Sequence, residues 1–282
     1  MTISQLGRTV ALVAALVGPA ACSSDAQTSA TDRTSSTTEE WPNSMVVLGH
    51  SGATGYNSDP ANPGSDAIQN SWATGDNPQV DSIYARALAQ NPALEGNNFN
   101  LAVDGSTVSD LPRQVDAALA LAPLPDLFII QAIDNDIRCD GTDHENYEPY
   151  GAAMSDVLAS INAGAPDAQI FVVGLWATVE NYTDVTQQIP AAIRDNQGGG
   201  PCDVFDASGN KLPEVMTYFQ DVIDHYQAQL NAACDSVATC VYAGDAIRNM
   251  VITADDLTAD TYHLAIAGQA KMANTAWTAL VE

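Results

Sequence analysis

Basic residues are scarce in this sequence of 282 residues. Nine Lys and Arg stand against 35 Asp and Glu, which gives a formal net charge of −26 at pH 7. A nucleic-acid-binding surface needs clustered positive charge, so nucleic acid is not an expected partner. The same negative charge opposes binding to an anionic bilayer surface. The acidic excess therefore predicts a solvated surface rather than either of these binding functions.

Metal-binding and phosphate-binding patterns are also missing. The five cysteines include no CxxC pair, the short spacing that zinc sites use. The acidic cluster of Asp134, Asp136, Asp140 and Asp143 lacks the spacing of a calcium-binding loop. The triple glycine at 198–200 lacks the following lysine of a phosphate-binding loop. We therefore expect no metal and no cofactor.

The first 22 residues have the pattern of a secretory signal peptide. Arg8 precedes an apolar run at 9–17 that is too short to span a bilayer, and small residues follow it. Cys22 comes directly after two alanines, as at a bacterial lipoprotein cleavage site, but Pro19 stands where Leu or Val is usual. Lipidation of Cys22 and ordinary cleavage with release both stay open. We expect an exported protein, extracellular or at the cell surface, attached to a membrane only if Cys22 is lipidated.

A polar stretch separates this signal from the rest of the chain. Residues 23–43 are rich in Ser, Thr, Asp and Glu, and such a composition favours a flexible linker. Residues 44–282 contain no second linker, which favours one large domain, expected to be a monomer.

Short apolar runs alternate with longer helical patterns along this domain. The expected strands are 45–48, 99–103, 126–133, 169–176 and 239–242. The expected helices are 80–90, 111–121, 147–162, 213–232 and 264–280. This alternation predicts a three-layer α/β/α, flavodoxin-like fold with a central parallel sheet of about five strands. Functional residues should gather at the carboxyl ends of these strands. The loop-like segments 56–79 and 181–210 are long enough to be functional walls or mobile segments.

Four cysteines remain when Cys22 is set aside, and an even number in an exported protein suggests two disulfides. Four cysteines allow three pairings. Cys234 and Cys240 are the favoured pair, because they lie six residues apart between an expected helix and an expected strand. Cys139 would then bond to Cys202 and anchor the second loop-like segment near the third strand.

Two segments carry residues for nucleophilic catalysis. Ser51 follows the first strand between glycines, in Gly49-His50-Ser51-Gly52, where a hydroxyl can be held exposed. Near the other end, Asp260 precedes His263 by three residues, so that its carboxylate can reach back and orient the imidazole as a general base. Each signal also has a structural interpretation: Ser51 as a turn residue, and Asp260 as a cap of the last helix.

Two further residues could stabilise an oxyanion. Gly105 follows the second strand, where its backbone N–H could face a carbonyl group, and Asn135 follows the third strand with a donating side-chain amide. Taken singly, each is more often an ordinary turn residue.

The order of these residues resembles the SGNH (GDSL-like) hydrolases. The family has a serine after the first strand, a glycine after the second, an asparagine after the third, and Asp-x-x-His before the last helix. The resemblance spans 46–273 and implies a serine carboxylic-ester hydrolase with an acyl-enzyme intermediate. It implies Ser51, Asp260 and His263 as the catalytic triad, and the Ser51 amide with Gly105 and Asn135 as the oxyanion hole.

This sequence departs from the family at two positions. His50 stands where Asp usually precedes the serine; it either changes the pH response of His263 or is a buried packing residue. Ile133 replaces a glycine two residues before Asn135, and we expect it to narrow the space beside the oxyanion site.

Two other functions stay open at this stage. One is a non-catalytic exported binding module on the same fold, and the other is a phospholipase or lipase acting on lipid esters. The sequence does not decide whether the substrate is a small-molecule, carbohydrate or lipid ester.

Overall fold

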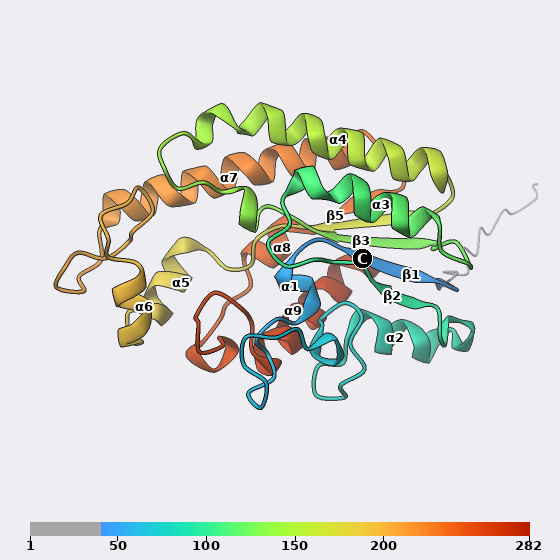
Figure 1. Cartoon of the computed structure of the whole chain (residues 1–282), viewed down its shortest axis with the longest axis horizontal. Helices are drawn as coiled ribbons and strands as arrows, with labels where there is room; N and C mark the ends of the chain where they lie inside the picture. The colour runs from blue at the N-terminus through green and yellow to red at the C-terminus, as the bar shows by residue number, and fades with distance from the viewer. Residues whose placement is uncertain (1–40) are drawn as a thin grey trace, which may run out of the picture. The chain divides into compact units, whose positions relative to one another are not determined.

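The computed structural model describes residues 41–282, which form a layered α/β unit around one sheet (Figure 1). The sheet contains five parallel strands in the order β2-β1-β3-β4-β5. The strands are β1 (Met45–Leu48), β2 (Asn98–Asn100), β3 (Leu127–Gln131), β4 (Gln169–Val173) and β5 (Cys240–Tyr242). The predicted parallel sheet of five strands is therefore confirmed, with β2, β3 and β4 ending earlier than expected.

Helices cover both faces of the sheet. The helices are α1 (Ser51–Thr54), α2 (Ile83–Gln90), α3 (Leu111–Leu119), α4 (Tyr147–Gly164), α5 (Val179–Thr186), α6 (Pro190–Asp195), α7 (Pro213–Asp235), α8 (Gly244–Arg248) and α9 (Ile266–Val281). Short 3-10 turns occur at Ile68–Asn70, Pro92–Leu94, Val108–Asp110, Asp134–Asp136, Asp143–Glu145 and Ala254–Asp256. All five helices expected from the sequence are present.

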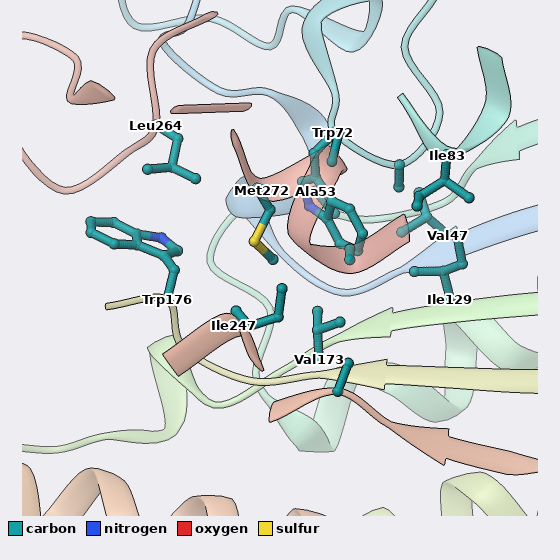
Figure 2. Packing of buried hydrophobic residues seen from close by; sticks show 14 of the residues in the cluster. Val47, Ala53, Trp72, Ile83, Ile129, Val173, Trp176, Ile247, Leu264 and Met272 are labelled. Atoms are coloured by element: carbon teal, nitrogen blue, oxygen red, sulfur yellow. The ribbon is translucent and has the colours of Figure 1, made fainter. Parts of the chain in front are cut away.

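Alternate residues of the central strands point to opposite layers. Val46 and Phe128 pack under α3, α4 and α7, whereas Val47 and Ile129 pack against α2, α8 and α9. Figure 2 shows the apolar cluster that contains Val47 and Ile129, to which Met272 of α9 also belongs. Strands buried on both faces require near-continuous apolar sequence, which is why β1 and β3 were readily predicted. The three-layer α/β/α arrangement is confirmed.

The segment 181–210, expected to be a loop, begins within one helix and contains another. Thr178 caps α5 by accepting a hydrogen bond from the backbone N–H of Asn181 at 3.2 Å, and Pro190 opens α6 at the position where a missing N–H costs little. These short helices pack around a small apolar cluster that includes Phe205, which precedes α7, and Ile223, which lies on α7. The two helices were not predicted because this segment is rich in Gly, Pro, Asn and Asp, a composition typical of loops.

The folded unit includes residues that the sequence placed in the linker. Trp41 stacks on Trp277 of α9 with ring centroids 4.9 Å apart, and Asn43 donates to Asp126 through its backbone and side chain. The predicted signal peptide and Cys22 lie outside the described residues. Among residues 41–282, no helix has both the length and the apolar character needed to cross a membrane.

Both expected disulfides are present in the structure. Cys234 at the end of α7 is bonded to Cys240 of β5, and Cys139 after β3 is bonded to Cys202. The second bond ties the segment around α6 to the loop that follows β3.

Candidate active site

The turn that carries Ser51 follows directly from β1. Gly49 has a φ of +136°, and a Cβ at this position would clash with the carbonyl group of Gln131 in β3. A Cβ on Gly52 would clash with the side chain of the same glutamine. Glycine is therefore required on both sides of the His50–Ser51 pair, because the turn packs directly against β3. Helix α1 then begins at Ser51, at the carboxyl end of the sheet.

The structure brings Ser51, His263 and Asp260 together. Oγ of Ser51 lies 2.9 Å from Nε2 of His263, and Nδ1 of His263 lies 2.8 Å from Oδ2 of Asp260. A carboxylate at this distance accepts the Nδ1 proton, which leaves Nε2 able to accept the serine proton. Tyr56 lies against the imidazole, with ring centroids 4.8 Å apart.

Asp260 is held in place from several directions. Oδ1 accepts from Oγ1 of Thr258 at 2.6 Å and from the backbone N–H groups of Tyr262 and His263. Oδ2 accepts from Nδ2 of Asn57 at 2.6 Å as well as from the imidazole. Burial favours the neutral acid, but the hydrogen bonds from His263 and Thr258 outweigh it and hold the pKa of Asp260 well below its usual value. Asp260 is therefore ionised near neutral pH.

Asn135 and Gly105 lie on loops that are joined to each other. Nδ2 of Asn135 donates to the carbonyl oxygen of Ser106 at 3.0 Å, which leaves the second N–H of this amide for another acceptor. Gly105 has a φ of +72°, which favours glycine. Within residues 41–282, the backbone N–H groups of Gly105 and Ser51 donate to no protein acceptor. Asn135 lines the same pocket as Ser51, whereas Gly105 lines a second pocket.

His50 is buried, and neither of its ring nitrogens contacts a triad side chain. Its Nδ1 accepts a hydrogen bond from the backbone N–H of Gly52 at 3.1 Å, so it caps the helix that begins at Ser51. Its Nε2 lies 2.9 Å from Oδ2 of Asp134, close enough for an ion pair, although the two atoms do not have the geometry of a hydrogen bond. Burial lowers the pKa of His50, but the Asp134 carboxylate offsets this effect, and the pKa is raised overall. Of the two roles considered for His50, this geometry favours the buried one.

Ile133 does not narrow the site as expected. Its side chain is fully buried in the cluster under α3, α4 and α7, and it is not among the residues that line the pocket. Its φ of +107° is one that β-branched residues rarely adopt, so the turn before Asn135 is strained.

The acidic residues after β3 bind neighbouring groups of the chain. Asp134 faces His50, Asp136 accepts from the N–H of Val108, Asp140 from Thr142, and Asp143 from the N–H groups of Arg138 and Cys139. Burial raises the pKa of Asp136 to about 6, despite the hydrogen bond from Val108. Within residues 41–282, no group of three or more His, Cys, Asp or Glu side chains is arranged to hold a metal ion.

A pocket of about 470 Å³ opens beside Ser51 and His263. Its apolar wall is formed by Ile137, Leu175, Trp176, Val179, Phe219 and Ile223. Tyr182 and Tyr262 add aromatic surface, and Asp195, Asn196 and Asp203 add polar groups. Both members of the Cys139–Cys202 disulfide also line it, so the bond is part of the pocket.

Removing this disulfide is expected to affect activity as well as stability. We expect the double variant Cys139→Ser/Cys202→Ser to lower the free energy of unfolding by about 4 kcal/mol and to weaken ester turnover, because a pocket wall loses its anchor. The matched control is Cys234→Ser/Cys240→Ser, which removes a disulfide that closes a much shorter loop and does not line the pocket. This control should lower the free energy of unfolding by about 2 kcal/mol and leave turnover unchanged. Urea unfolding and kcat/KM check this, and equal activity losses in both variants would contradict it.

Several residues that organise the site were not predicted from the sequence. Asn57 holds Asp260, and Gln114 binds both the N–H and the carbonyl oxygen of Gly49 at 2.7 and 2.9 Å. Gln131 accepts from the indole N–H of Trp72 at 2.9 Å beneath the Ser51 turn. A glutamine at the end of an otherwise apolar strand was the one signal available for Gln131.

Solved structures with this fold include known esterases. An acetylxylan esterase from Geobacillus stearothermophilus is 15% identical with a TM-score of 0.50, and 84% of this chain and 93% of that chain are covered. An extracellular lipase from Streptomyces rimosus is 15% identical with a TM-score of 0.51, covering 83% of this chain and 98% of that chain. At such identities the likeness shows the fold alone. No curated protein matches the sequence.

A family profile provides the stronger comparison. The profile described as GDSL-like Lipase/Acylhydrolase matches residues 45–276, from the first residue of β1 into α9. The match includes the Ser51 turn, the loops of Gly105 and Asn135, and the Asp260–His263 segment. Because this match covers most of the chain, the protein belongs to the GDSL-like lipase/acylhydrolase family, whose reaction is the hydrolysis of esters.

Proposed function

We propose that the protein is a serine carboxylic-ester hydrolase that works through an acyl-enzyme on Ser51. The observation that supports this best is the chain of contacts from Asp260 through His263 to Ser51, at 2.8 and 2.9 Å, in the wall of a pocket. Hydroxyl, imidazole and carboxylate in this order are the arrangement that makes a serine nucleophilic at neutral pH.

The reaction then has two halves. Oγ of Ser51 attacks the ester carbonyl carbon while Nε2 of His263 takes the hydroxyl proton. The tetrahedral intermediate expels the alcohol, which leaves with that proton. A water molecule attacks the acyl-serine in the same way, giving its proton to His263 and releasing the carboxylic acid as Ser51 regains its proton. No cofactor takes part in this proposal.

The oxyanion of each intermediate would be held by three donors. These are the backbone N–H groups of Ser51 and Gly105 and the second N–H of the Asn135 amide, all without a protein acceptor in the described part of the chain. The bond from Asn135 to Ser106 supports this assignment, because it places the asparagine beside the Gly105 loop. Donors fixed in advance stabilise developing charge without reorganisation.

Covalent labelling tests the proposal. A serine-directed fluorophosphonate should add one phosphonyl group to the wild type, located on Ser51 by peptide mass spectrometry. Ser51→Ala should not be labelled, whereas the matched control Ser160→Ala, at an exposed serine on α4, should be labelled fully. A non-catalytic binding module would show no label, and a label on another serine would equally defeat the assignment.

We further propose that the protein is exported and acts as a monomer outside the cell or at its surface. The two disulfides support this location, because such bonds persist in oxidising compartments. N-terminal sequencing and mass analysis of the mature protein, isolated from culture medium and from membranes, would distinguish simple release from lipidation at Cys22.

A further inference from the structure

We propose that the pocket beside Ser51 binds an apolar, uncharged acyl chain, so that the preferred substrates are esters of medium-length aliphatic or aromatic acids. This inference rests on the proposed function and adds the substrate class. The pocket, at about 470 Å³, is far larger than an acetyl group requires.

The far wall of the pocket supports an apolar ligand. Phe219 and Ile223 lie one turn apart on α7 and also belong to the small apolar cluster around Phe205, so a rigid helix supports this wall. Trp176 and Val179 close the side that follows β4, and both are nearly buried. An apolar chain entering this space would lose contact with water and gain packing against these side chains.

The charges around the pocket argue against an anionic ligand. Asp195 and Asp203 line it together with Tyr262, and burial, helped by these two carboxylates, raises the pKa of Tyr262. No described lysine or arginine side chain lines it, and the two histidines that do, His50 and His263, are each paired with a carboxylate. A carboxylate on the acyl chain would be desolvated next to these negative charges.

Polar groups outside the pocket suit the alcohol part of the ester. Thr54, on the helix that begins at Ser51, donates from Oγ1 to Asp66 at 2.6 Å and lies 3.1 Å from Asp104; both aspartates are exposed, and neither lines the pocket. A polar alcohol tolerates this surface, whereas an alkyl chain gains nothing from it. The acyl chain is therefore assigned to the apolar pocket.

A chain-length series tests the assignment. With p-nitrophenyl acetate, butyrate, hexanoate and octanoate below their micelle concentrations, kcat/KM should rise about fourfold per methylene until the pocket is filled. A p-nitrophenyl ester of similar length that ends in a carboxylate should be at least about tenfold poorer than its neutral counterpart. A series of acetate esters with lengthening alcohols should show no such rise.

Variants place the effect in the pocket. Phe219→Ala should lower the octanoate-to-acetate ratio of kcat/KM by about tenfold, and Phe219→Trp should move the optimum to a shorter chain. Tyr218→Ala, the neighbouring position on α7 outside the pocket, should keep the wild-type ratio. Asp195→Asn should improve the carboxylate-ended ester, and the remote Asp235→Asn should not.

The outcomes separate this inference from the proposed function. A wild type that labels on Ser51 and hydrolyses acetate best, with kcat/KM falling as the acyl chain lengthens, would overturn the acyl-pocket assignment alone. A rise that follows the alcohol chain instead would also overturn it. A wild type that hydrolyses no ester and takes no label would reject the proposed function itself.

Discussion

Ser51→Ala is expected to abolish nearly all ester turnover while leaving the fold intact. The variant removes the atom that forms the acyl-enzyme, so kcat/KM should fall on the order of 10⁵-fold. The only side-chain partner of the Ser51 hydroxyl in the described part of the chain is Nε2 of His263, so its loss should change stability by less than about 1 kcal/mol. Initial rates with p-nitrophenyl esters and urea unfolding would measure both.

Variants of the other two triad residues extend this test. His263→Ala should lose activity to a similar degree, because without the imidazole no group accepts the serine proton. Asp260→Asn should cost less, roughly 10²- to 10⁴-fold, since the amide favours the tautomer in which Nε2 of His263 carries the proton and cannot accept that of the serine. Exposed His225 on α7 gives the matched control, and His225→Ala should keep full activity. A folded Ser51→Ala variant with most of its activity would reject the triad.

Much of the fold follows from the sequence because the buried strands need continuous apolar residues. β1 and β3 are covered on both faces. In a polar, acidic chain, a continuous run of apolar side chains indicates a buried strand of this kind. β5 was a weaker prediction because it lies at the sheet edge and is only partly buried. Helices α5 and α6 were missed because both are short and their segment is rich in Gly, Pro, Asn and Asp; they pack around Phe205 in the folded chain.

The candidate catalytic residues were found from local patterns and from their order along the chain, whereas the residues that support them were not. Asp260 and His263 are three residues apart, so their contact is short-range, and Ser51 is placed by the end of β1. The hydrogen bond from Asn57 to Asp260 joins residues that are 203 positions apart. Such a contact depends on how two loops meet in space, and an asparagine in a loop carries no sign of it.

The shape of the pocket could not be predicted for the same reason. Its walls come from the segment after β4, from α7 and from a disulfide that joins residues 63 positions apart. Each wall residue is an ordinary apolar side chain in its own element. Only the folded arrangement shows that Phe219 and Ser51 line one space.

His50→Asp, which restores the residue usual before the serine, is expected to destabilise this protein strongly. His50 is 3% exposed and faces Asp134, with Asp136 also nearby. Aspartate could still cap α1, but it would place a second carboxylate against Asp134 in a buried space. Loss of the His50–Asp134 ion pair, together with repulsion between the two carboxylates, should lower the free energy of unfolding by about 3 to 5 kcal/mol at pH 7.

A compensating substitution and the pH dependence identify the cause. His50→Asp/Asp134→Asn removes the like-charge contact and should recover most of the stability, with a coupling energy of about 1 to 3 kcal/mol. In wild type the raised pKa of His50 gives stability that is full below its ordinary pKa and is lost as pH rises through the raised value. In His50→Asp the crowded carboxylates bind protons more tightly when folded, so this variant should regain stability as pH falls from 7 to 5. Urea unfolding of all three proteins at both pH values tests this; if the single and double variants are equally unstable at pH 7, charge repulsion at Asp134 is not the cause.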